Sequence, residues 1–76
     1  MADDKVYKLI EIVGTSSSSI DDAMKNAVAR ASQTLRGIDW VELGEVRGLV
    51  KDGKLSEFQT KLRVGFRLMD EGELKA

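Results

Sequence analysis

The sequence predicts an α+β domain of β-α-β-β order, in which a three-stranded antiparallel sheet in the order 1-3-2 is wrapped around one helix. Residues 20–36 carry apolar side chains at helical spacing, and residues 55–69 alternate apolar and polar side chains. Between two strand-like runs, Asp52-Gly53 is a type I′ hairpin signal. A right-handed crossover makes strands 1 and 2 parallel, so strand 3 can pair antiparallel to both if it lies between them.

The first strand is predicted at residues 5–13, which are rich in β-formers on both faces, and Gly14 is expected to end it. The helix is predicted at residues 20–36. Ser19 is a typical N-cap with Asp22 three residues later, and Gly37 is the expected residue just past the C-terminus. The hydroxyl-rich loop before this helix has no Gly-Lys phosphate-binding pattern, which favours a capped loop over a phosphate cradle.

The second and third strands are predicted at residues 38–50 and 55–69. At roughly 3.3 Å per residue, a third strand of this length spans about 50 Å. A compact domain of this size is only about 30 Å across. The hairpin must therefore curl around the helix or project beyond the domain, and its glycines are candidate points for a bulge.

Composition excludes several classes of function. The 76 residues, read as a single domain spanning 1–76, contain no His and no Cys, so neither a nucleophile–base pair nor a Cys/His metal site can be built. We therefore expect no enzyme, no catalytic residue and no metal. A net charge of −1 offers no field for nucleic acid, and no apolar run reaches the roughly 20 residues of a membrane span. Cysteine usage fits a cytoplasmic protein, and so small a scaffold without disulfides is expected to oligomerise.

Trp40, the only tryptophan, falls on the sheet face predicted to point away from the helix. A two-residue turn at Asp52-Gly53 places Trp40 opposite Gly65 and Val46 opposite Gln59, all on this open face. The indole then has cleared space beside it, and an amide shares its face. This arrangement suits a planar heterocycle that stacks on the ring and pairs through its edge, and it equally suits a tryptophan packed in a subunit interface.

Glu45 and Arg47 break the alternation of the second strand, because both fall at positions where neighbours point to the core. Two inward charges would need partners. Either the strand bulges near Gly44 or Gly48, or both side chains reach an interface, as an ion-pair network or with Arg47 holding an anionic ligand group.

The chain resembles the dodecin family of small flavin-binding proteins over roughly residues 5–70. The segments that carry the resemblance are VYKLIEIVGTS at 6–16, DDAMKNAVARASQTL at 21–35, DWVELGEVRG at 39–48 and FQTKLRVGFRL at 58–68. Their order and spacing, taken together, are specific. The resemblance implies a hollow dodecamer in which each subunit is a sheet wrapped on one helix.

The resemblance also implies that flavins bind in pairs at two-fold subunit contacts. Each flavin ring would stack between its partner flavin and a tryptophan, which Trp40 matches in the DW segment. Gln59 matches the glutamine that pairs with the flavin ring edge. Arg47 and Arg67 match arginines associated with the phosphate-bearing end of FMN.

Further members of the implied pocket come from the same segments. Glu45 aligns with an acidic position near the ribityl chain, and Asp39 is a neighbour of the same pocket, as is Val46. Some members bind coenzyme A, and no motif in this chain decides whether it does. The motifs also leave FMN and riboflavin as alternatives.

We therefore expect non-catalytic flavin binding for storage, buffering and photoprotection. The alternative is a structural or interaction module in which Trp40 anchors an oligomer interface without a ligand. A flavoenzyme is a third reading, and the lack of an acid–base residue such as His argues against it.

Overall fold

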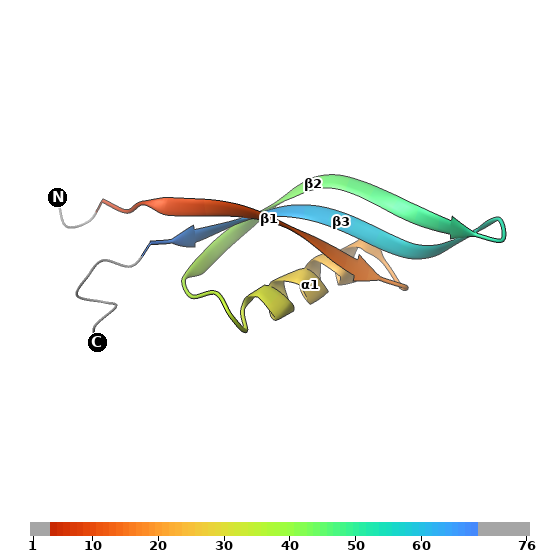
Figure 1. Ribbon diagram of the computed structural model, residues 1–76, viewed down its shortest axis with the longest axis horizontal. Helices are drawn as coiled ribbons and strands as arrows, with labels where there is room; N and C mark the ends of the chain where they lie inside the picture. The colour runs from red at the N-terminus through yellow and green to blue at the C-terminus, as the bar shows by residue number, and fades with distance from the viewer. Residues whose placement is uncertain (1–3, 69–76) are drawn as a thin grey trace.

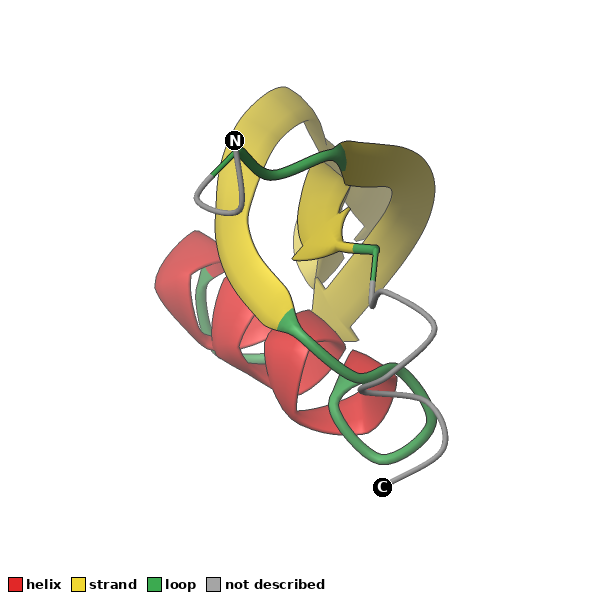
Figure 2. Ribbon diagram, turned by 90° about the vertical axis from the view of Figure 1, so that its left-hand side faces the viewer, coloured by secondary structure: helices red, strands yellow, loops and turns green. Residues whose placement is uncertain are grey.

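The computed structural model describes residues 4–68 as three strands and one helix. These are β1 (Tyr7–Ser16), α1 (Ile20–Ala31), β2 (Ile38–Lys51) and β3 (Lys54–Arg67). The sheet order is β1-β3-β2, and β3 pairs antiparallel with both neighbours. The helix lies against one face of the sheet (Figure 1), and the strands curve over it when the molecule is seen from its end (Figure 2). The predicted fold is confirmed.

Two element boundaries differ from the prediction. β1 continues to Ser16, because Gly14 pairs with Thr60 and Ser16 pairs with Phe58, so Gly14 does not end the strand. The helix ends at Ala31 and not at residue 36. Its last turn tightens, with the amide N–H groups of residues 33 and 34 donating to carbonyls three residues back.

The remaining described boundaries agree with the prediction or differ from it by one or two residues. The second strand runs to Lys51 and the third begins at Lys54. Both hairpin residues have positive φ, 52° at Asp52 and 75° at Gly53, as a type I′ turn requires. The predicted end of the third strand at residue 69 lies outside the described residues.

The helix entry is organised by two serines. The Ser19 hydroxyl accepts a hydrogen bond from the Asp22 N–H at 3.0 Å, which confirms the predicted N-cap. Ser16 is buried, and its hydroxyl donates to Asp22 Oδ2 at 2.8 Å while accepting from the Ser18 N–H at 2.9 Å. The end of β1 and the start of α1 are thereby held together.

The core is small and lies between α1 and the middle of the sheet. It consists of one alanine per helical turn and two side chains from β3: Ala23, Ala27, Ala31, Leu62 and Val64. A Cβ at Gly14 would lie 2.2 Å from the Ala23 carbonyl oxygen, so only glycine permits this approach of helix to strand.

The hairpin projects beyond the helix (Figure 1). β1 ends opposite Phe58, so residues 49–57 of the hairpin have no third strand beside them, and the molecule measures 55 × 20 × 14 Å. Of the two predicted outcomes, projection is the one observed. The helix packs on β1 and β3, and apolar side chains of β2 such as Leu43 and Val46 remain 48% and 41% exposed. No helix in the described part of the chain has the length and apolar character that crossing a bilayer requires.

Candidate functional site

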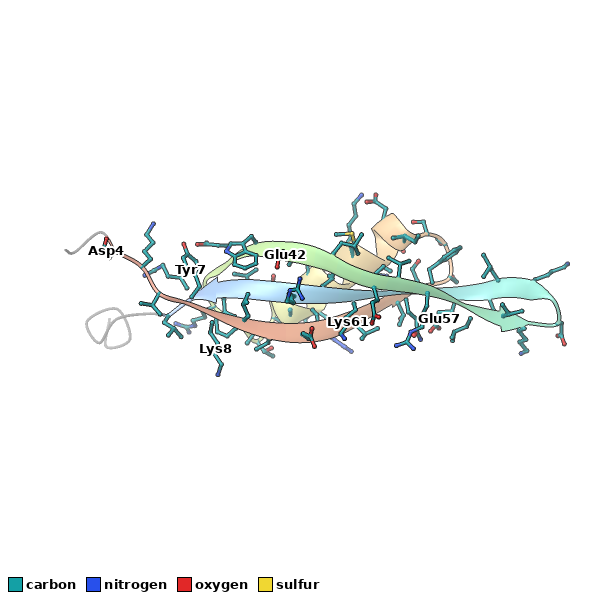
Figure 3. All side chains as sticks on the ribbon, turned by 90° about the horizontal axis from the view of Figure 1, so that it is seen from above. Asp4, Tyr7, Lys8, Glu42, Glu57 and Lys61 are labelled. Atoms are coloured by element: carbon teal, nitrogen blue, oxygen red, sulfur yellow. The ribbon has the colours of Figure 1, made fainter. Side chains whose placement is uncertain are left out.

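The face of the sheet opposite α1 carries the candidate site. The odd-numbered positions of β3 point to this open face, because the even-numbered Thr60, Leu62 and Val64 are completely buried on the helix side. Figure 3 views the open face, with Tyr7, Glu42, Lys61 and Glu57 labelled in order along the sheet.

Trp40 lies across Gly65. The two residues are cross-strand partners, as the sequence predicted. A Cβ on Gly65 would lie 2.3 Å from both Cε2 and Cζ2 of the indole and 2.7 Å from Cδ2. These near-equal distances mean that Gly65 meets the ring face and not its edge. The residue remains 39% exposed, so part of the indole is open to solvent.

Tyr7 and Asp39 support this indole from the side. The Tyr7 and Trp40 ring centroids are 6.4 Å apart with an interplanar angle of 51°, which is within the range of favourable aromatic pairs. The Tyr7 hydroxyl donates a hydrogen bond to Asp39 Oδ2 at 3.0 Å. This bond raises the pKa of Tyr7, with smaller contributions from partial desolvation and the Asp39 charge, while Arg67 acts in the opposite direction.

The position of Asp39 follows from a local irregularity in β2. Ile38 pairs with Phe66 and Trp40 with Gly65, so Asp39 is the extra residue of a bulge. Sequence reasoning placed Asp39 near the pocket and missed Tyr7. The signal for Tyr7 was its place on the face of β1 that carries Leu9, which pairs with Gly65 from the other side.

A second bulge corrects the predicted register in the middle of β2. Gly44 and Glu45 together oppose Lys61, and Ser56 compensates as an unpaired residue on β3. The predicted pairing of Val46 with Gln59 is therefore wrong by one residue.

The shifted register exchanges which side chains face the open side. Arg47 is opposite Gln59, and Val46 is opposite the buried Thr60 on the helix side. Because cross-strand partners share a face, Arg47 and Gln59 lie together on the open face. The bulge near Gly44, one of the predicted explanations for the broken alternation, keeps both charges out of the core.

Charged and amide groups around Gln59 form a polar cluster, defined here as Arg47, Glu57, Gln59, Glu45 and Lys61. Gln59 Nε2 donates to Glu57 Oε2 at 2.9 Å, and Lys61 Nζ lies 3.8 Å from Glu45 Oε1. Within residues 4–68, Arg47 has no ion-pair partner within 4.0 Å. Exposed pairs of this kind add little stability, so these groups remain available to a polar ligand.

The indole and the polar cluster share a face without touching. Gly65, beneath Trp40, and Gln59 are six residues apart on β3, which corresponds to roughly 20 Å along the strand. The Arg63–Glu42 ion pair, at 3.1 Å, lies between them. The predicted juxtaposition of amide and ring is thus not formed within one subunit.

Three hollows of the described surface lie away from this face. Three hollows of about 330, 430 and 400 Å³ flank α1 on the helix side of the sheet. The residues that line these three hollows do not include Trp40, Arg47 or Gln59. Within the described residues, no group of three or more side chains is placed to hold a metal ion.

Comparison with known proteins identifies the family. The family model described as Dodecin matches residues 6–69. The chain belongs to the dodecin family. It is 48% identical to the dodecin of Thermus thermophilus over 64 residues, covering 84% of this chain and 93% of that protein.

Solved dodecins share the fold. The structure of dodecin from Streptomyces coelicolor superposes with a TM-score of 0.87 at 46% identity, covering 91% of this chain and 99% of that chain. The dodecin from Streptomyces davaonensis gives a TM-score of 0.84 at 45% identity, covering 87% and 97% respectively. The β-α-β-β sheet and helix are therefore the dodecin fold.

Proposed function

We propose that this protein binds flavins, as FMN or riboflavin, without catalysing a reaction on them, and that it stores, buffers and photoprotects them. The observation that carries the proposal is the indole of Trp40, which lies face-on against Gly65 and remains 39% exposed. A planar, partly exposed aromatic ring favours a planar heterocycle as its partner, and the chain belongs to a family of small flavin-binding proteins.

The separation of the two candidate contacts favours binding between subunits. A flavin ring that stacks on Trp40 cannot reach Gln59 of the same chain, roughly 20 Å away along β3. The amide that pairs with the ring edge would come from a second copy. Flavin pairs at two-fold contacts of a homo-oligomer, the dodecamer that the family resemblance implies, satisfy this requirement.

The amount of uncovered apolar surface supports an oligomer. Many large apolar side chains of the single chain are at least 38% exposed, among them Leu9, Leu43, Leu49 and Leu55. Only the alanine side of the helical stripe is buried, while Met24 and Val28 line an open hollow. A subunit this small gains the stability it lacks by covering such surface.

Polar side chains on the open face would contact the polar parts of the ligand. Arg47 and Arg67 would hold the phosphate-bearing end of FMN, and Glu45 would lie near the ribityl chain. Asp39 acts through its bond to Tyr7, beside the stacking indole. Val46, on the opposite face of β2, would contact a flavin only from a neighbouring subunit.

Stacking also supplies the photochemical role. An indole in contact with an excited flavin donates an electron and receives it back, which quenches fluorescence and suppresses radical chemistry. With no His or Cys in the chain, we assign no acid–base or nucleophilic step to the site.

The proposal is tested by titrating FMN or riboflavin with the protein and following flavin fluorescence. Stacking of a planar base on an aromatic side chain contributes ~1–3 kcal/mol, so Trp40→Ala should weaken binding by about 5–150-fold. Leu43→Ala is the matched control, because Leu43 is as exposed but lies on the other face of β2. If Trp40 is instead a ligand-free interface anchor, wild-type protein will ignore flavin and Trp40→Ala will dissociate the oligomer on a sizing column.

A further inference from the structure

We propose that Tyr7 and Asp39 form a relay that returns an electron to Trp40 whenever the indole has lost one. The aromatic rings of Tyr7 and Trp40 are neighbours, with centroids 6.4 Å apart, and the Tyr7 hydroxyl donates to Asp39 Oδ2 at 3.0 Å. An electron donor thus adjoins the indole, and a base is already bonded to the donor's proton.

The relay step is balanced within these three side chains. One electron passes from the Tyr7 ring to the Trp40 radical cation, and the indole returns to its neutral closed-shell form. The oxidised phenol is a strong acid, and its proton moves along the existing hydrogen bond to Asp39. The products are a neutral Tyr7 radical and a protonated Asp39 carboxyl group.

Before oxidation, Tyr7 is held in its protonated form. The hydrogen bond to Asp39 raises the pKa of Tyr7, so the phenol holds its proton until it is oxidised. A hydrogen-bonded phenol is easier to oxidise than an isolated one, because no separated positive charge is formed when the proton leaves with the electron. Tyr7 is 38% exposed, so soluble reductants can reach the residue that ends up oxidised.

The use of this relay in flavin photochemistry rests on the proposed function. An excited flavin that takes an electron from Trp40 normally returns it. If dioxygen removes that electron from the flavin radical first, Trp40 is left oxidised. Transfer from Tyr7 then restores the indole, and a soluble thiolate returns one electron to Tyr7 while Asp39 returns the proton. The Trp40 indole is thereby kept intact, and the thiolate is oxidised in its place.

The composition of the chain makes the relay directly observable. There is one Trp and one Tyr in the sequence, so each radical signal belongs to a single residue type at a single position. Pulse radiolysis of the ligand-free protein with azide radicals, which oxidise indole preferentially, generates the Trp40 radical without any flavin. Absorption then follows the tryptophan and tyrosyl radicals separately.

In wild-type protein, the tryptophan radical should decay into a tyrosyl radical at a rate independent of protein concentration. Tyr7→Phe should abolish the tyrosyl signal, and Asp39→Asn, which keeps a hydrogen-bond acceptor but removes the base, should slow the transfer about tenfold or more. Leu9→Ala, at the β1 position that pairs with Gly65, should leave the rate unchanged. Decay of the wild-type tryptophan radical without a tyrosyl product, or equal rates in wild type and Asp39→Asn, would overturn the relay.

Flavin titrations of the same proteins separate this inference from the proposed function. At saturating flavin, Tyr7→Phe should still quench the bound flavin, because Trp40 is intact, yet it should lose Trp40 fluorescence several-fold faster than wild type during prolonged aerobic illumination. Failure of flavin binding would overturn the proposed function and leave the radical measurement standing. Failure of the radical measurement would overturn the relay and leave flavin binding standing.

Discussion

Replacing Gly65 by alanine should displace the Trp40 indole without removing it. The added methyl carbon would lie 2.3 Å from Cε2 and Cζ2 of Trp40, whereas carbon atoms pack at about 3.5 Å or more. The indole must therefore move outward by roughly 1.2 Å or tilt. Because Trp40 is 39% exposed, it has room to do so, and the cost in unfolding free energy should be about 1–2 kcal/mol, in the lower part of the range for overpacking.

The displaced ring should also bind flavin less well. A tilted indole offers less contact to a planar partner. We therefore expect the dissociation constant for FMN or riboflavin to rise about tenfold, which corresponds to a loss of ~1.4 kcal/mol in binding free energy. Urea unfolding gives the stability change, and fluorescence titration gives the affinity. Gly48→Ala serves as the matched glycine control, because the one close contact of its new methyl would be with the flexible end of the Leu55 side chain.

A double-mutant cycle decides whether the indole is the cause. In a Trp40→Ala background, Gly65→Ala no longer meets a ring, and it should be neutral or stabilising by ~0.5 kcal/mol, the usual advantage of alanine over glycine. An equal cost of Gly65→Ala with and without the indole would refute the geometry on which the site is built.

Three further predictions concern the supports of the site. Gly14→Ala should cost about 3 kcal/mol in urea unfolding, because its Cβ would meet the Ala23 carbonyl at 2.2 Å and backbone cannot rotate away; a cost below ~1 kcal/mol would contradict this packing. Ser16→Ala should cost ~1–2 kcal/mol in the same assay, because a buried hydroxyl that bonds Asp22 is lost, and an unchanged midpoint would argue against it. The raised pKa of Tyr7 means that the folded protein holds the phenolic proton more tightly than the unfolded protein does. The free energy of unfolding should therefore fall as the pH rises above about 10, and Tyr7→Phe should remove this part of the fall.

Local patterns were sufficient to predict the elements. The alternation of β3, the alanine-rich helical stripe and the Asp52-Gly53 turn each depend on short-range geometry, and the parallel arrangement of β1 and β2 leaves room for β3 between them. The misplaced end of β1 has a tertiary cause. Gly14 looks like a terminator in the sequence, but it is needed inside the strand where the helix backbone approaches.

The residues of the site could be predicted only where the β2–β3 register could be predicted. Trp40 opposite Gly65 follows from counting back from the turn, and it is correct because the two intervening bulges compensate one another. Between those bulges the count fails by one, which exchanges Val46 for Arg47 opposite Gln59. Tyr7 could not be paired with Trp40, because the β1–β3 register is fixed by tertiary packing and not by a turn.

The central claim is that a flavin stacks on Trp40 between subunits, and one titration tests it most directly. Purified wild-type protein, added to saturation, should quench most of the fluorescence of FMN or riboflavin. The end point should be one flavin per chain, and the oligomer should remain intact on a sizing column. Unchanged flavin fluorescence at saturating protein would contradict the account.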